Sequence, residues 1–538
     1  MMNRMFKSGD SREQPSLLPP RIEDYVGPDN PVRAIDGFVN ALDLVKLGFR
    51  HASRGAGAGQ PPYDPSDLLK LYLYGYINRV RSSRRLEREA GRNLELIWLL
   101  RTLRPGYRTI ANFRKENWAA LKAANRNFVL VLRELDLIGG TLVALDGALF
   151  HGNASKGSIF TKGKLAKQIA ELDREIDAYG KALDANDTEE AKQLSIDLKD
   201  GSKGDGGDVG AKVKELMARR ERAQADLKDL GTSDRGQVSK TDSDARLLSK
   251  GDQTIAGYNV QSVVDDKHML IVGSEVVNRS DAGHLHVMAK AAKDALDVKA
   301  LQVLADEGYY NSEDLKACED DGITAYVPIH DGNRTLEKQG RFPRKDFSYD
   351  ANDDVYRCPA GELLHPTKKS WTNASGRVEI RYLSSRMSCD ACPMRARCLG
   401  PKAKIRSVFR WEHEAVLDRH RARMAKEGTS QLMRRRSAIV EHPFGTLKCR
   451  AGYQHFLVRG FEKVSGEWSL MALCYNFTRV LNILGFERFM ACIAEKILLP
   501  RQNALIAALN CIQLALKPFR PRIISWFAIR RIGAAPAG

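Results

Sequence analysis

One short segment, IVEHPFGTLKCR, sets a single carboxylate in a basic neighbourhood. Glu441 stands seven residues before Lys448, and shortly before it come three consecutive arginines, Arg434, Arg435 and Arg436. Seven residues are about two helical turns, so Glu441 and Lys448 can share one helix face, although Pro443 and Gly445 argue against a regular helix over the whole span. The segment therefore suits a metal ligand beside a bound phosphate. The alternative is a surface ion pair.

Two aspartates follow apolar, strand-like runs elsewhere in the chain. GTLVALDGALF carries Asp146 and LQVLADEGYY carries Asp306, each at the expected end of a buried strand. An ionised group in such a place costs desolvation free energy unless something compensates it. Together with Glu441, the two aspartates could hold two Mg²⁺ ions that activate a hydroxyl and stabilise the leaving oxygen in phosphoryl transfer. The competing carboxylates, which spacing does not exclude, are Asp242, Asp244 and Asp281.

Four cysteines form a second candidate metal site. Cys358 lies in YRCPAGELLHP, and MSCDACPMRARC supplies Cys389, Cys392 and Cys398. A C-x-x-C pair with two further cysteines resembles a structural Zn²⁺ site, in which four thiolates close a tetrahedron. His365 is an alternative ligand that could replace one of the four cysteines. The spacing differs from that of a standard finger, and reduced thiols without metal are the alternative.

Composition narrows the class of partner. The 538 residues carry a formal net charge of +18, which favours a polyanionic partner, most simply nucleic acid, over an anionic membrane surface. The first residues lack the apolar core of a secretion signal, and the longest apolar tract (504–516) is too short to span a bilayer. Nine unevenly spaced cysteines do not suit a disulfide framework. We expect a reducing, cytoplasmic compartment.

Basic helices are predicted near the N-terminus. Between Asp67 and Ala120, twelve Lys and Arg residues stand against five Asp and Glu, and apolar and basic residues alternate at helical spacing. This pattern is typical of a helical DNA-binding module, and a basic, solvated helix bundle is the alternative. The candidate phosphate contacts are Arg84, Arg85, Arg108 and Arg114.

The segment from Lys162 to Leu230 has a different character. Apolar residues recur at steps of three and four on both sides of a Gly/Asp-rich break, and fourteen basic residues nearly balance sixteen acidic ones. The pattern predicts an antiparallel coiled-coil hairpin inserted into another domain. This segment lacks the positive charge of the sequence on either side of it. It is therefore better suited to contact another protein, or to act as a rigid spacer, than to bind DNA.

The remaining strands alternate with helices, which predicts an α/β layer with a mixed sheet. Here the pieces LDGALFHGNASKG, TDSDAR, GYNVQ, LADEGYY and VEHPFGTLK resemble, in their order and surroundings, the DDE transposases of bacterial insertion sequences. The resemblance extends from about Pro15 to Phe486. It implies a ribonuclease H-like fold, and it implies that Mg²⁺ or Mn²⁺ is held by Asp146, Asp306 and Glu441.

The resemblance also implies that Lys448 contacts DNA phosphate near the cleavage point. One departure concerns the residues before Glu441. Ser437 stands where the family often has an arginine, and Arg436 is one residue earlier. Met433 stands where a tyrosine would fall. The identity of the functional arginine therefore stays open.

These inferences predict seven segments. They are a basic helical DNA-binding region (1–135), three parts of a ribonuclease H-like core (136–161, 241–332 and 406–486), the coiled-coil insertion (162–240), a cysteine-bearing insertion stapled by zinc (333–405) and a helical basic tail (487–538). The predicted activity is cleavage of double-stranded DNA at element ends and joining to a target, by a homodimer or larger assembly at the bacterial nucleoid. The alternatives are a silent DNA-binding descendant and a metal-dependent nuclease that does not join strands.

Overall fold

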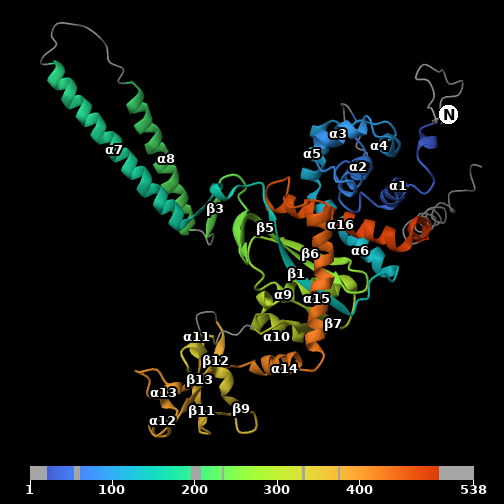
Figure 1. Cartoon of the computed structure of the whole chain (residues 1–538). Coiled ribbons are helices and arrows are strands. Elements are labelled where there is room, and N and C mark those ends of the chain that lie inside the picture. The colour runs from blue at the N-terminus through green and yellow to red at the C-terminus, as the bar shows by residue number, and fades with distance from the viewer. Residues whose placement is uncertain are drawn as a thin grey trace, which may run out of the picture. The chain divides into compact units, whose positions relative to one another are not determined.

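The structure, a computed structural model, describes residues 21–53, 61–194, 207–232, 236–329, 334–372 and 376–495 (Figure 1). The chain divides into two units, Met1–Leu137 with Gly466–Gly538, and Ile138–Ser465. Most of the predicted tail (496–538) lies outside the described residues. A search of the described helices finds no segment with the length and hydropathy of a membrane span.

The first unit is helical. Its described helices are α1 (Pro31–Ala41), α2 (Pro65–Ile77), α3 (Ser83–Ala90), α4 (Leu94–Leu99), α5 (Tyr107–Glu116), α6 (Trp118–Glu134), α17 (Phe486–Ile493) and most of α16 (Phe461–Leu484). Asn30 and Asp64 cap α1 and α2, each just before a proline. Helix α2 is buried along almost its whole length.

Residues from Gly466 onward belong to this helical unit, whereas the sequence interpretation assigned residues up to 486 to the α/β core. Apolar packing explains the difference. The ring of Phe38 lies 5.1 Å from that of Phe128 and 5.6 Å from that of Phe477. A Cβ added to Gly466 would lie 2.7 Å from the Cα of Trp118, so only glycine permits this approach.

A buried carboxylate organises polar side chains inside the helical unit. Glu467 is fully buried and accepts a hydrogen bond of 2.7 Å from the Tyr76 hydroxyl. Arg114 donates to the same carboxylate over 3.4 Å and to Tyr76 over 3.0 Å. Arg114 is only 6% exposed. The sequence predicted that Arg114 contacts DNA phosphate, but the side chain is buried inside the unit. It lies there because the buried charge of Glu467 needs a cationic partner.

The second unit is built around a mixed sheet. Its strand order is β4 (Arg246–Lys250), β5 (Gln253–Asp265), β1 (Leu142–His151), β7 (Leu301–Leu304) and β8 (Ile323–Tyr326), and β6 (Ile271–Val277) also pairs with β5. β1 is antiparallel to β5 and parallel to β7. Helix α9 (Leu285–Leu296) and helix α15 (Thr429–Gly445) both contact β1 and β5. The predicted mixed α/β fold is confirmed.

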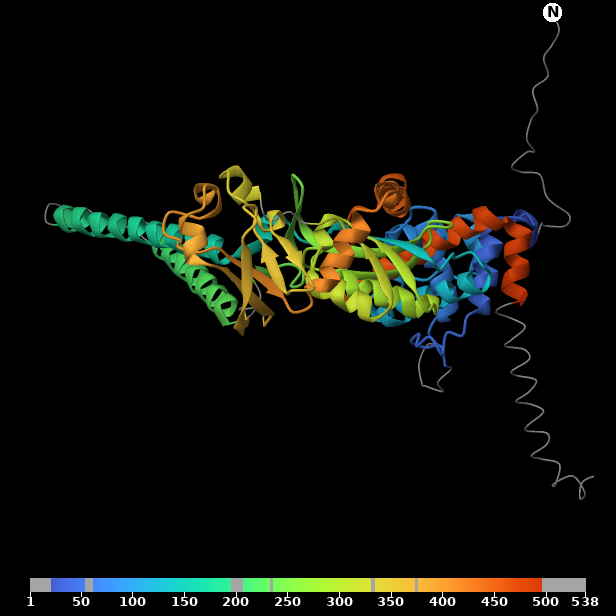
Figure 2. The same cartoon turned by 90° about the horizontal axis from the view of Figure 1, so that it is seen from below.

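Two long helices, α7 (Lys162–Leu194) and α8 (Gly207–Thr232), lie side by side where the sequence predicts a hairpin (Figure 1 and Figure 2). Short strands β2 (Ile159–Thr161) and β3 (Gln237–Ser239) pair at their base. Leu165, Ala223 and Leu230 form a buried cluster there. Arg220, which interrupts the apolar pattern, pairs with Asp173 of the opposite helix. The role of the hairpin in assembly stays a prediction.

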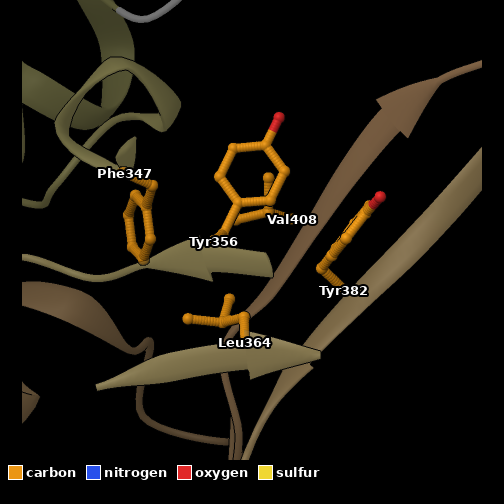
Figure 3. Packing of buried hydrophobic residues seen from close by; sticks show 5 residues of the cluster. All are labelled: Phe347, Tyr356, Leu364, Tyr382 and Val408. Carbon is orange, nitrogen blue, oxygen red and sulfur yellow. The ribbon is translucent and has the colours of Figure 1, made fainter. Parts of the chain in front are cut away.

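The cysteine-bearing region contains an antiparallel sheet of its own. Its strands follow the order β13 (Ser407–Trp411), β12 (Val378–Ser384), β11 (Leu363–Thr372), β10 (Val355–Arg357) and β9 (Ser348–Asp350). Figure 3 shows the core over this sheet, formed by Phe347, Tyr356, Leu364, Tyr382 and Val408. Helices α12 (Arg386–Asp390) and α13 (Arg395–Cys398) lie between β12 and β13 in the chain, and α14 (Glu414–Met424) follows β13.

We predict that Arg114→Met destabilises the protein by about 3 kcal/mol, because it leaves the buried Glu467 with less compensating charge. The measurement is urea unfolding followed by tryptophan fluorescence. Arg108→Met, an exposed arginine on the same helix, is the matched control, and its effect should stay within about 0.5 kcal/mol. Equal effects of the two substitutions would contradict the structural role of Arg114.

Candidate active site

The register of the sheet brings Asp146 and Asp306 to the same level. In the parallel pair of β1 and β7, Ala144 lies opposite Leu304, and each aspartate stands two residues further along its own segment. β7 ends at Leu304, but β1 continues to His151 because β5 pairs with it along the other side. The sequence predicted Asp146 at the end of a strand, but the residue lies within β1. It is nevertheless beyond the end of the neighbouring strand β7.

Arg436 of α15 contacts both aspartates. Its guanidinium nitrogens lie 3.6 Å from Oδ2 of Asp146 and 3.8 Å from Oδ2 of Asp306. The side chain of Arg436 is 15% exposed. Neighbouring carboxylates repel each other, and a cation between them offsets the repulsion. The sequence suggested a DNA contact for Arg436, whereas here it joins the two predicted metal ligands.

Lys250, at the end of β4, is a second cation at the site. Its Nζ lies 3.0 Å from Oδ1 of Asp146 and 3.5 Å from Oδ2 of Asp281, and it donates to the carbonyl of Gly147 over 2.7 Å. Burial favours the neutral amine, but the Asp146 and Asp281 carboxylates outweigh it and raise the pKa of Lys250 above its ordinary value. No motif in the sequence indicated Lys250.

Asp281, which the sequence left as a competing carboxylate, belongs to the same group of side chains. Its Oδ1 accepts hydrogen bonds from Asn259 Nδ2 (2.7 Å) and Gln261 Nε2 (2.8 Å). A Cβ added to Gly147 would lie 2.1 Å from this oxygen, so the glycine creates the space for Asp281. Buried Tyr309 donates in turn to Gln261. Period-two spacing within GYNVQ, which sets both amides on one strand face, is the signal that could have found them.

The other two competing carboxylates have structural partners. Asp242 is buried and accepts from the Tyr258 hydroxyl (2.8 Å) and the backbone N–H of Gly460 (3.1 Å). Asp244 accepts from the backbone N–H of Phe461 over 2.9 Å. Both aspartates therefore anchor the start of α16 within this unit.

Glu441 lies in α15, five residues after Arg436, and its side chain is exposed. Among the described residues, no hydrogen bond or ion pair joins it to Asp146, Asp306 or Lys448. After Gly445 the chain continues as a π-helix (Thr446–Arg450), so a spacing of seven does not guarantee a shared face. The surface ion pair considered for Glu441 and Lys448 is absent from the described side chains.

Lys448 is half-buried beside β1. Its Nζ donates to the carbonyl of Leu149 over 2.7 Å and lies 4.6 Å from the centre of the Phe150 ring. Burial lowers the pKa of Lys448, and the nearby Lys250 ammonium lowers it further. An anion that approaches Lys448 would stabilise the protonated form of its amine.

The donor set of this site suits a hard divalent cation, because Asp146 and Asp306 offer carboxylate oxygens at one level of the sheet. Within the described ranges, no group of three or more His, Cys, Asp or Glu side chains is arranged to hold a metal ion. Instead, Arg436 and Lys250 contact the carboxylates. Metal binding at Asp146 must therefore compete with these two cations.

The other predicted DNA contacts have varied surroundings. Arg434 is exposed, and Arg435 pairs with Asp266 over 2.7 Å. In the helical unit, Arg84, Arg85 and Arg108 are exposed. The guanidinium groups of Arg84 and Arg108 lie 5.3 Å and 5.9 Å from the centre of the Tyr107 ring. Three exposed arginines and an aromatic ring thus gather on α3 and α5.

The four candidate zinc ligands line one small cavity beside β11 and β12. These are Cys358, Cys389, Cys392 and Cys398. Burial raises the pKa of the Cys398 thiol, and the other three cysteines contribute to the shift. The Cys389 thiol lies 3.0 Å from the Ser384 hydroxyl. His365 is exposed on β11 and is not among the residues that line the cavity. The thiols are gathered, but they are not in a metal-binding arrangement.

Comparison with known families agrees with the predicted class. Residues 20–116 match the family described as "Transposase domain (DUF772)", and residues 357–481 match "Transposase DDE domain". The resemblance to the DDE transposases is confirmed. The second match contains Arg436, Glu441 and Lys448, and Asp146 and Asp306 precede it.

No curated protein matches the chain. Among solved structures, a chain of the cryo-EM structure of the piggyBac transposase synaptic complex with hairpin DNA is similar over 87% of this chain and 80% of that chain. The identity is 8% and the TM-score 0.30. At that level the two chains share too little for residues to be equated.

We predict that Gly147→Ala displaces Asp281 and destabilises the protein by about 1–3 kcal/mol, because the added methyl group has no space. Urea unfolding measures the loss. Gly308→Ala is the matched control, since its Cβ would meet Asp281 at an ordinary distance of 3.7 Å. If the two variants are equally stable, the tight contact at Gly147 is not as described.

Proposed function

We propose that this chain is a DNA transposase that cleaves the ends of an insertion sequence and joins the freed 3′-hydroxyls to target DNA. The observation that carries the proposal is the match of residues 357–481, with Glu441 and Lys448, to a transposase DDE domain. The register that aligns Asp146 with Asp306 supports it. The mixed sheet around β1 supports a ribonuclease H-like core.

In this proposal Asp146, Asp306 and Glu441 hold two Mg²⁺ or Mn²⁺ ions. When bound, such ions activate the attacking hydroxyl and stabilise the leaving oxygen. Glu441 has to approach the two aspartates, and its exposed position on α15 leaves it accessible to do so. Lys448 holds a phosphate of the DNA, for which its amine must exchange the carbonyl of Leu149 for a phosphate oxygen.

The proposed partner is double-stranded DNA, both element ends and target. The net charge of +18 favours a polyanion, and the exposed arginines of α3 and α5 suit phosphate contacts. Arg434 and Arg435 would extend the contact near the active site. Cutting two ends together requires at least a dimer, and the paired helices α7 and α8 are the proposed contact between copies.

Two other functions fit parts of the same observations. A silent descendant would bind DNA through the same arginines without cutting it, and a nuclease would cut without joining. The gathering of Asp146, Asp306 and Arg436 favours a working site over a silent one. Formation of a strand-transfer product distinguishes the transposase from both.

We predict that purified protein incubated with its element ends and Mg²⁺ or Mn²⁺ gives cleaved and joined products. Glu441→Gln should lower the cleavage rate by about 10³-fold or more, because a metal ligand contributes several kcal/mol to the transition state. Gel analysis of labelled ends measures both steps. Glu427→Gln, another exposed carboxylate shortly before α15, is the control and should cleave normally.

Each failure of this experiment has its own meaning. Binding of the ends without cleavage by either protein favours the silent DNA-binding function. Cleavage without joined products favours the nuclease. Normal cleavage by Glu441→Gln would remove Glu441 from the metal site.

We further propose that the cysteine cavity closes around one structural Zn²⁺. The support is the gathering of four thiols around one cavity, since four thiolates can complete a tetrahedron around Zn²⁺. Protein purified without chelator should contain about one equivalent of zinc, measured by elemental analysis, and Cys389→Ser with Cys392→Ser should lose it. The substitution Cys318→Ser, at a buried cysteine outside the cavity, is the control. Absence of zinc from the native protein would leave four reduced thiols.

A further inference from the structure

The amine of Lys250 lies between two carboxylates that belong to different segments of the chain. It is 3.0 Å from Oδ1 of Asp146 and 3.5 Å from Oδ2 of Asp281. Its side chain is 42% exposed and extends from an edge position of the sheet, where β4 pairs with β5 alone among the described strands. A lysine so placed can exchange one carboxylate for the other by rotating its side chain, without any movement of the backbone.

Asp281 is fixed in a way that leaves one of its oxygens for this exchange. The two amides of Asn259 and Gln261 hold Oδ1, and Oδ2 faces Lys250. The Tyr309 hydroxyl donates a hydrogen bond to Gln261, and Asp281 fits beside Gly147 because a glycine has no side chain. Oδ2 of Asp281 is therefore a rigidly presented anionic partner, about as close to the amine as Asp146 is.

We propose that Lys250 is a positioning residue for metal binding, which neutralises Asp146 before a divalent ion arrives and then moves to Oδ2 of Asp281. This inference rests on the proposed role of Asp146 as a metal ligand. A divalent ion at Asp146 repels the ammonium group, and a partly covered cation that loses its counter-ion costs free energy. Asp281 removes that cost because it receives the displaced amine. Asp281 itself does not contact the ion in this scheme.

The competition has a measurable consequence in the absence of DNA. Binding of Mn²⁺ to the full-length protein can be followed by the electron paramagnetic resonance signal of free Mn²⁺. Lys250→Met removes the competing cation and should tighten binding about fivefold, while Asp281→Asn, which keeps an oxygen for the two amides, should weaken it by about the same factor. Thermal unfolding of each variant verifies that the fold is intact.

The double variant separates this scheme from simple electrostatics. If Asp281 acts by receiving Lys250, Asp281→Asn should have little effect on Mn²⁺ affinity once residue 250 is methionine. If Asp281 attracts or binds the ion directly, the weakening should persist in the Lys250→Met background, and that result would overturn the proposal. Lys290→Met controls for loss of a surface charge, because Lys290 is 45% exposed and pairs with Asp321 over 3.3 Å. It should leave the affinity unchanged.

The variant Asp146→Asn distinguishes a failure of the proposed role of Lys250 from a failure of the proposed metal-binding role of Asp146. If Asp146→Asn abolishes Mn²⁺ binding but Lys250→Met leaves the affinity unchanged, the metal site stands and the role of Lys250 is refuted. If Mn²⁺ binds equally well to wild type and Asp146→Asn, Asp146 is not a ligand. Both the metal assignment and the role of Lys250 then fall.

Discussion

The parallel pairing of β1 with β7 is the constraint on which the rest of the site depends. It sets Asp146 and Asp306, 160 residues apart in the sequence, at one level of the sheet. Carboxylates gathered in this way repel one another and lose hydration. The sheet can hold them only if cations are supplied from elsewhere, and this requirement accounts for the positions of Arg436 and Lys250.

The compensation comes from three parts of the fold. Helix α15 delivers Arg436, the β4–β5 hairpin delivers Lys250, and β5 carries the two amides that hold Asp281. Gly147 makes the arrangement sterically feasible, since any side chain there would collide with Asp281. The region is thus a charge cluster of three carboxylates and two cations, in which each carboxylate already has a partner. Under the proposed function, a divalent ion would have to displace these cations from the carboxylates.

The helical unit also contains a carboxylate that needs a cationic partner, and there the pairing stabilises the fold. Glu467 is buried, and the chain satisfies it with Arg114 and Tyr76 from helices far away in sequence. The same residue type therefore has opposite uses in one basic stretch. Arg114 supports the fold from within, whereas Arg84 and Arg108 remain exposed beside Tyr107. Net charge alone does not tell these uses apart.

The sequence by itself determined the mixed α/β class and the two long helices α7 and α8, because periodicity is a local property of the chain. It also predicted the helix that contains Glu441. The cysteine-bearing insertion and the metal-binding role of the two aspartates stay predictions. Only the tertiary structure decided that Asp146 lies inside a strand, that Arg114 is buried and that Lys250 and Asp281 join the site. These facts depend on strand register and on contacts between distant segments. Local patterns do not encode which cation reaches which carboxylate, since that is set by how the sheet and α15 pack.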